Sequence, residues 1–350
     1  METQPNKLTL LDATVSNALA AEYSFEIQQV WQHRKIWRLD TTSGSKYLKR
    51  SKLNSEDLIF IHEAVEYLYQ QGFAQVPRFK LTRKGEPFIR VGAELYVLTD
   101  WYQGRELDFQ VLMDLKQACG LLAKFHQAGR GFKPSCPDFR TAWLNWPNKW
   151  EIRIRELEEF RVLAQSEKDT SPFSQLYLRH FEPFYRQANR SYEQLHASPY
   201  RQVATEAANQ RSFCHHDFSG RNLIRTDDGP IIMIDFDYCL QDLRIHDLIN
   251  LLVRNLKHSA WQNELGRFIL AQYHQIAPLT LEELQVMLVL LSWPQDFWQI
   301  GLQYYKEKLP WPPERFIKKL ERKIEQRFER ERFLNEFPKE NGVLCWEEGK

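Results

Sequence analysis

Residues 215–223, His215-His216-Asp217-Phe218-Ser219-Gly220-Arg221-Asn222-Leu223, and the later stretch Ile234-Asp235-Phe236-Asp237 form the most informative pattern in this chain. They place Asn222 five residues after Asp217, and Asp235 thirteen residues after Asn222. Phosphoryl transfer from a nucleotide uses such a set: one carboxylate orients the attacking hydroxyl and takes its proton, while an amide and a second carboxylate hold the metal. The apolar run 231–234 predicts a buried strand that directs Asp235 toward a hard cation.

A short motif is weak evidence by itself, because an Asp at the end of a strand often only caps a turn. The spacing of three polar groups after the right kind of strand makes that simpler interpretation the less favoured one. The motif also requires partner groups upstream, and the first part of the chain should contain them.

The N-terminal part of the chain predicts a small sheet that carries a lysine. Three strands are expected, and the residues Thr42-Ser43-Gly44-Ser45 form a good hairpin turn between the last two. The strands cover residues 23–31, 35–41 and 46–51. Lys49 lies in the third strand.

Glu63 follows on a predicted helix over residues 56–71, which Asn54 or Ser55 begins and which ends before Gly72. A strand lysine and a carboxylate on the next helix form the ion pair that holds nucleotide phosphates in kinases. Two solvated side chains would be the ordinary alternative. Upstream of the Asp217 motif, the ion pair is the favoured interpretation.

With these motifs in hand, the chain resembles the aminoglycoside phosphotransferase/choline kinase branch of the protein-kinase-like fold. More narrowly, it resembles the CotS-type spore coat proteins of spore-forming bacteria. The landmarks run in family order and include Lys46–Arg50, His62–Ala64, Val76-Pro77, Tyr96–Trp101, Gly104-Arg105, Leu122–His126, His215–Asn222, Ile234–Asp237 and Asp247-Leu248.

The resemblance implies an α+β fold with two lobes, a small one built on an antiparallel sheet and a larger, mainly helical one. The expected boundaries are an N-lobe over residues 1–98, a hinge over 99–104, a helical C-lobe over 105–335 with a catalytic loop at 215–222, a metal strand at 231–237 and a helical insert at 140–210, and a tail over 336–350.

It also implies roles for individual residues and two cofactors, ATP and Mg²⁺. Asp217 would be the catalytic base, and Asn222 and Asp235 would bind the metal with help from Asp237. Lys49 would contact the phosphates and Glu63 would orient Lys49. The remaining expectations are adenine contacts from the backbone of Thr99, Asp100 and Trp101, and a brace on the catalytic loop from Asp247.

Two departures from the family pattern bear on activity. Residues 28–35 contain no glycine, although protein kinases usually carry a glycine-rich loop over the phosphates. Ser219 stands where protein kinases generally place the lysine that steadies the transferred phosphoryl group, and Arg221 could supply a charge instead. These departures favour a small-molecule hydroxyl acceptor, or a catalytically weak protein with a structural role in the spore coat.

The acceptor is expected among the C-terminal helices, which are predicted at 247–258, 261–275, 280–292 and 295–308. Trp293, Asp296 and Trp298 could hold a cationic acceptor by cation–π contact and charge. Such an aromatic cluster is more often core or a protein-docking surface. A final helix near 313–333 carries Ile317, Leu320, Ile324 and Phe328 on one stripe, which indicates an amphipathic docking helix.

Composition is consistent with a globular protein of two cores. The chain has 350 residues, 43% of them hydrophobic, and a net charge of +1, which gives no reason to expect a nucleic acid or an anionic membrane as partner. A mean hydropathy of −0.55 and the lack of a long apolar run predict no membrane span, and the N-terminus lacks a signal-peptide pattern. The five cysteines (119, 136, 214, 239 and 345) show no metal-ligand spacing. We therefore expect synthesis in the cytoplasm and deposition in the spore coat, with nucleotide, acceptor and other coat proteins as partners.

Overall fold

The computed structural model describes residues 7–33, 36–136, 140–166 and 171–340. The chain forms two compact units, each drawn from two segments: residues 1–140 with 217–239, and residues 141–216 with 240–350. Antiparallel sheet comes first and helices dominate the remainder, which confirms the predicted α+β class. Lys35, Cys345 and the end of the predicted tail lie outside the described residues.

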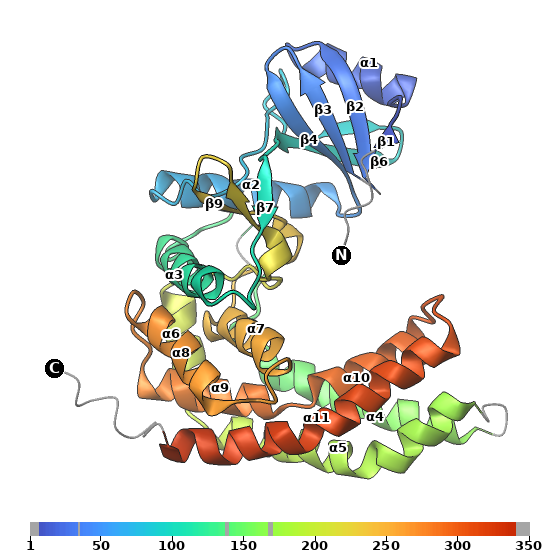
Figure 1. The fold of residues 1–350 in the computed structure, drawn as a ribbon, viewed down its shortest axis with the longest axis vertical. Helices are drawn as coiled ribbons and strands as arrows, with labels where there is room; N and C mark the ends of the chain where they lie inside the picture. The colour runs from blue at the N-terminus through green and yellow to red at the C-terminus, as the bar shows by residue number, and fades with distance from the viewer. Residues whose placement is uncertain (1–6, 34–35, 137–139, 167–170, 341–350) are drawn as a thin grey trace. The chain divides into compact units, whose positions relative to one another are not determined.

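The first unit contains a six-stranded antiparallel sheet in the order β1-β2-β3-β4-β6-β5 (Figure 1). Its strands are β1 (Lys7–Leu8), β2 (Ile27–His33), β3 (Ile36–Thr41), β4 (Gly44–Ser51), β5 (Ile89–Val91) and β6 (Glu94–Asp100). Helix α1 (Ala13–Glu22) begins at Asp12, whose side chain accepts a hydrogen bond from the Thr14 amide. Val15 and Leu19 of α1 pack with Leu39, Leu48 and Leu98 of the sheet to form its core.

The β3–β4 hairpin fixes the position of Lys49. Gly44 has φ +89°, a left-handed conformation that glycine adopts without strain, and the Thr41 hydroxyl donates to its carbonyl at 2.7 Å. Because side chains alternate along a strand, Leu48 points into the core with α1 and Lys49 projects from the opposite face.

Helix α2 (Ser55–Gln70) begins as the sequence predicts. Asn54 accepts from the Asp57 amide and Asp57 accepts from the Asn54 amide, which completes a capping box. Leu58, Ile61, Val65 and Leu68 are buried along one face.

A second, three-stranded sheet in the first unit contains the segments that follow Asn222 and lead into the Asp235 and Asp237 motif. It runs β7 (Gly104–Glu106), β8 (Leu223–Thr226) and β9 (Ile231–Met233), and α3 (Leu112–Ala128) follows β7 in the sequence. Pairing of β7 with β8 accompanies the placement of residues 217–239 in the same compact unit as the N-terminal sheet. Gly220 is required here, because a Cβ would collide with the Leu107 carbonyl.

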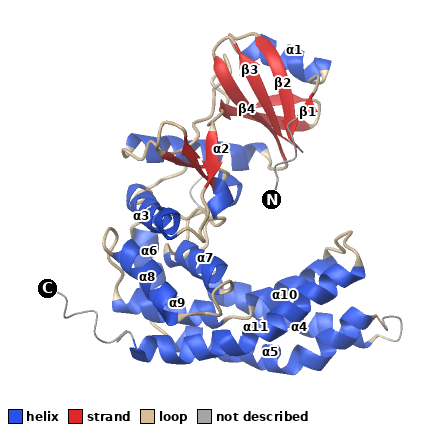
Figure 2. Ribbon diagram, viewed as in Figure 1, coloured by secondary structure: helices blue, strands red, loops and turns tan. Residues whose placement is uncertain are grey.

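The second unit is built from helices (Figure 2). These are α4 (Trp146–Gln165), α5 (Pro172–Ala197), α6 (Tyr200–Asn209), α7 (Ile245–Leu256), α8 (Asn263–His274), α9 (Leu281–Ser292), α10 (Gln295–Gly301), the π-helical turn η3 (Leu302–Lys306) and α11 (Pro313–Glu340). Ser171 caps α5, its side chain accepting from the Ser174 amide, and Pro172 occupies the first position of the helix.

Helix α11 extends beyond the predicted end at residue 333. Phe316, Leu320, Phe333 and Phe337 form its buried face. Phe328 was expected on the packed stripe, but it is 73% exposed, because the buried face follows a different set of positions along this long helix. In the part of the chain that the structure describes, no helix combines the length and apolar character needed to span a membrane.

Candidate active site

Asp217 and Asn222 lie at the two ends of a short loop that closes in the 3₁₀ turn η1 (Gly220–Asn222). The Asn222 side-chain nitrogen donates to the Asp217 carbonyl at 2.8 Å and to Asp217 Oδ2 at 3.0 Å. Arg221 lies 3.3 Å from the same carboxylate oxygen and is largely exposed. The five-residue spacing in the sequence therefore becomes a direct contact that orients the Asp217 carboxylate.

Asp235 enters this site at the end of β9. The register of β8 with β9 pairs Leu223 with Met233, and the Ile234 amide donates to the Asn222 carbonyl at 2.9 Å. Asp235 itself adopts a left-handed conformation with φ +65°, which is uncommon for a residue with a side chain and is typical of functional sites. The ladder thus places Asp235 beside Asn222.

Lys49 closes the site from the six-stranded sheet. Its ammonium lies 2.8 Å from Asp235 Oδ1 and 2.7 Å from Asp237 Oδ2. Although burial opposes the charge, Asp237 and Asp235 hold the pKa of Lys49 above its usual value. Lys49 is therefore a stable cation between two carboxylates that lie 186 and 188 residues further along the chain.

Glu63 does not form the predicted ion pair with Lys49. Its Oε2 accepts a hydrogen bond from the Ser135 amide at 2.9 Å, while the Lys49 ammonium is engaged by Asp235 and Asp237. The physical reason is that two carboxylates outcompete one for the lysine, and Glu63 has a backbone donor of its own.

The residues present fit a divalent cation. Asp235 and Asp237 direct oxygen atoms at one point, where the Lys49 ammonium provides positive charge. The side-chain nitrogen of Asn222 donates to Asp217, so the side-chain oxygen Oδ1 of Asn222 is the atom left for a cation. Carboxylate and amide oxygens are the ligands that Mg²⁺ prefers.

The predicted hinge residues are already partly engaged. The Trp101 amide donates to the Ser45 carbonyl at 3.0 Å, and Thr99 is paired with Tyr47 of β4 and bridged to Phe79. Although burial opposes ionisation, hydrogen bonds from Lys80 and Lys46 hold the pKa of Asp100 below its usual value. An adenine contact within residues 99–102 must therefore use the remaining backbone groups.

The structure does not gather Trp293, Asp296 and Trp298 into one acceptor pocket. Trp293 is buried and its ring stacks on Trp150 at 4.6 Å. Asp296 pairs with Lys323 at 3.0 Å.

Trp298 donates from its indole nitrogen to Glu156 at 2.8 Å, and the Arg153 guanidinium lies 4.2 Å from its ring centre. Packing and ion pairing occupy the groups that were expected to bind a cation, so these contacts do not support a cationic acceptor at this position.

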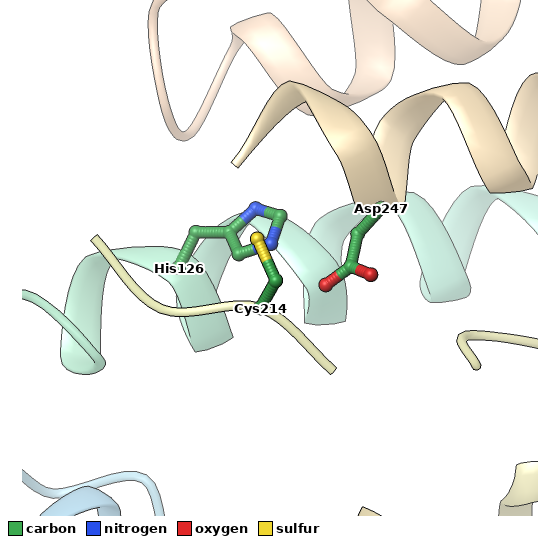
Figure 3. A group of neighbouring side chains, drawn as sticks. All are labelled: His126, Cys214 and Asp247. Atoms are coloured by element: carbon green, nitrogen blue, oxygen red, sulfur yellow. The ribbon is translucent and has the colours of Figure 1, made fainter. Parts of the chain in front are cut away.

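Asp247 binds the backbone directly before Asp217, the segment on which the resemblance implies a brace. Its two carboxylate oxygens accept from the His215 amide at 2.6 Å and the His216 amide at 2.7 Å. Figure 3 shows Asp247 on α7, together with Cys214 from the segment that precedes these amides. Cys214 donates to the Leu243 carbonyl, and burial raises the pKa of its thiol, so Cys214 is a core residue rather than a thiolate ligand.

A second buried aspartate in this region was missed at the level of sequence. Asp242 is fully buried, accepts from the Trp146 indole at 3.0 Å and lies 3.1 Å from the His216 imidazole. His216, which precedes Asp217 in the chain, has an uncommon left-handed backbone with φ +63°. The contact with Asp242 helps to hold His216 in this conformation. The sequence gives one signal for Asp242, which is its closeness to Asp247. Its partner Trp146 is 96 residues away in the sequence and could not be predicted from local patterns.

Comparison with known proteins identifies the family and the fold of this chain. A protein-family model described as "Spore coat putative kinase YutH" matches residues 16–337. Spore coat protein S of Bacillus subtilis is 28% identical over 313 residues, which cover 87% of each chain.

Among solved structures, an aminoglycoside phosphotransferase from Alicyclobacillus acidocaldarius has a TM-score of 0.79 at 22% identity, covering 96% of this chain and 98% of its own. Spectinomycin phosphotransferase, solved in complex with ADP and spectinomycin, has a TM-score of 0.58 at 12% identity, covering 92% and 95%. At these identities, the structural matches show the protein-kinase-like fold alone.

Proposed function

The chain belongs to the YutH family of spore coat proteins, and from this premise we propose that it is an ATP- and Mg²⁺-dependent phosphotransferase that acts on a hydroxyl group. The observation that carries this proposal is the convergence of Lys49, Asp217, Asn222, Asp235 and Asp237 within one compact unit. Lys49 contacts Asp235 and Asp237, Asn222 contacts Asp217, and the Ile234 amide links the two groups through the Asn222 backbone carbonyl. The nucleotide-bound relatives of the same fold support ATP as the donor.

Each residue has a role that its contacts support. Asp217, held by Asn222, would orient the acceptor hydroxyl and take its proton as the new oxygen–phosphorus bond forms. The bond between the γ-phosphorus and the bridging oxygen breaks at the same centre, and ADP leaves with the electron pair. Lys49 would bind the phosphate oxygens, and Asp235, Asp237 and Asn222 would hold Mg²⁺, which neutralises phosphate charge when bound.

Replacement of the base tests this proposal. Asp217→Asn should lower phosphate transfer by about 10²- to 10⁴-fold, because it removes the proton acceptor and keeps the shape of the side chain. Transfer should be measured with radiolabelled ATP on a panel of alcohols, sugars and proteins, with water as a further acceptor. Nucleotide affinity and thermal stability should change little.

Asp228→Asn, an identical change in an exposed turn, is the matched control and should transfer phosphate like the wild type. Equal turnover by Asp217→Asn and the wild type would refute the proposed role. A wild type that modifies no member of the panel and hydrolyses no ATP would count against the enzyme altogether.

A structural role in the spore coat is the second candidate. The pairing of β2 with β3 runs to His33 and Ile36, so only residues 34 and 35 separate the strands, and no glycine lies in residues 28–35. The sequence between these strands therefore lacks the glycines that protein kinases usually place over the phosphates, which favours weak catalysis. Similarity to spore coat protein S supports coat association, with other coat proteins as partners.

Spores made in a host that carries only Asp217→Asn separate the two candidates. Coat assembly that survives this change, together with loss of phosphate transfer, assigns assembly to the folded chain rather than to its chemistry. Coat assembly that fails with a correctly folded variant assigns assembly to the phosphotransfer reaction.

A further inference from the structure

The Lys49 ammonium lies between the two carboxylates that are best placed to bind a metal. It contacts Asp235 Oδ1 at 2.8 Å and Asp237 Oδ2 at 2.7 Å. All three side chains are partly exposed, at 21% for Lys49, 37% for Asp235 and 31% for Asp237. The contact is therefore accessible to a ligand and is not sealed inside the core.

We propose that Lys49 serves as an internal counter-ion in the nucleotide-free protein, so that a divalent cation binds weakly alone and tightly only together with the nucleotide. This inference rests on the proposed function and adds an order to its binding steps. Lys49 would have two alternative sets of partners: Asp235 and Asp237 before binding, and the phosphate oxygens after it.

Charge accounts for this coupling. A divalent cation that approaches Asp235 and Asp237 alone must either displace the ammonium or lie beside it, and both are unfavourable. A nucleotide removes this conflict because its phosphates offer Lys49 a new set of oxygen partners. The long, flexible side chain of a lysine permits such a movement without a change in the strand.

Glu63 does not offer Lys49 an alternative partner in this structure. Its carboxylate is held by the Ser135 amide at 2.9 Å, and the described residues place no other acid on the Lys49 ammonium. Tyr47 also interacts with this cluster in the described part of the chain; burial raises its pKa to about 12, so it stays neutral near pH 7. The exchange of Lys49 between carboxylates and phosphates thus involves Asp235 and Asp237 alone.

Binding of Mn²⁺ without nucleotide, followed by electron paramagnetic resonance of the free ion, tests the inference. Lys49→Met removes the charge at nearly constant length, and its Mn²⁺ affinity should rise about tenfold over the wild type, within the usual range of coupling between sites. Lys49→Arg keeps the charge and should bind Mn²⁺ as weakly as the wild type. Arg50→Met removes a charge from the next position of β4, where Arg50 lies near Glu94 at 3.8 Å, and should also resemble the wild type.

The outcomes separate this inference from the proposed function. Wild-type protein should bind Mn²⁺ more tightly in the presence of ADP, and failure to bind ADP with or without Mn²⁺ would remove the proposed function and the inference together. If ADP and Mn²⁺ bind jointly but Lys49→Met leaves the nucleotide-free Mn²⁺ affinity unchanged, only the inference fails. Should Lys49→Met not fold, as judged by circular dichroism, Lys49→Gln removes the same charge and the same two outcomes apply.

Discussion

At the scale of single residues, the protein uses burial to set which groups carry charge. His246 lies on α7 next to two aromatic rings. The centre of its ring is 4.9 Å from that of Trp146 and 4.2 Å from that of His216. Burial, and after it the neighbouring His216 imidazole, lowers the pKa of His246 to about 3, although Asp242 and Asp247 act in the opposite direction. His246 is therefore a neutral ring that packs in the folded protein and that regains its ordinary pKa when the chain unfolds.

This difference predicts how stability changes with pH. Between the ordinary pKa near 6.5 and the folded value of about 3, the unfolded chain binds a proton that the folded protein does not. The free energy of unfolding should therefore fall as pH is lowered through this window, by up to about 1.4 kcal/mol per pH unit from this residue. His246→Phe keeps an aromatic ring and should flatten the slope, as measured by urea denaturation between pH 4.5 and 7.

The same substitution at an exposed histidine is the control. His196→Phe should leave the wild-type slope unchanged, since His196 lies exposed at the end of α5. A slope that is identical in the wild type and in His246→Phe would show that other groups carry the acid sensitivity.

At the scale of elements, the residues that cap the start of α9 also connect this helix to α7. At the start of α9, Thr280 accepts from the Glu283 amide at 3.2 Å and Glu283 accepts from the Thr280 amide at 3.0 Å. Glu283 also accepts two hydrogen bonds from Arg244, both at 2.7 Å, directly before α7. One capping box thus starts α9 and connects it to the helix that carries Asp247.

Removal of this cap should measurably destabilise the protein. Thr280→Ala deletes the oxygen that satisfies the Glu283 amide, and we expect the free energy of unfolding to fall by about 1 kcal/mol. Guanidinium denaturation monitored by circular dichroism measures the change. Thr205→Ala makes the same replacement on the exposed face of α6 and should stay within about 0.5 kcal/mol of the wild type.

Elements of this kind could be predicted because their signals are local. The helix start at Asn54 or Ser55 and the hairpin turn over residues 42–45 depend on neighbouring residues, and both appear where the sequence predicts them. The partner of Lys49 could not be predicted in this way. Glu63 is fourteen residues away on an adjacent element, whereas the acids that bind Lys49 are nearly two hundred residues distant and are brought there by the β8–β9 ladder.

The same limit applies to the aromatic residues near the C-terminus. The sequence shows that Trp293 and Trp298 lie near an acid along the chain. It does not show that Trp150 and Arg153, on a helix far away in the sequence, pack on their rings. Phe328 likewise fits a helical stripe and is nevertheless exposed. Burial depends on what the rest of the chain supplies, so tertiary contacts decide between a pocket and a core.

At the scale of the whole molecule, neither compact unit is a continuous piece of chain. The first unit takes residues 217–239 from within the sequence of the second, and this short segment brings Asp217, Asn222, Asp235 and Asp237 to the sheet that carries Lys49. Residues 1–140 alone would lack the proposed base Asp217, the amide of Asn222 and the two carboxylates proposed to bind the metal. The proposed site therefore exists only when the chain has returned to the first unit.

Hydrogen–deuterium exchange can test this assembly in the intact protein. Ligand binding slows local opening of the elements that hold the ligand, so ADP with Mg²⁺ should reduce exchange together in β4, in residues 217–222 and in residues 231–237. These segments are far apart in the sequence and share only the proposed site. Adenosine lacks the phosphates and should protect the last two segments much less, while α11 should exchange equally in all samples. Protection confined to one of the three segments, although ADP is bound, would mean that β4, residues 217–222 and residues 231–237 do not form one nucleotide site.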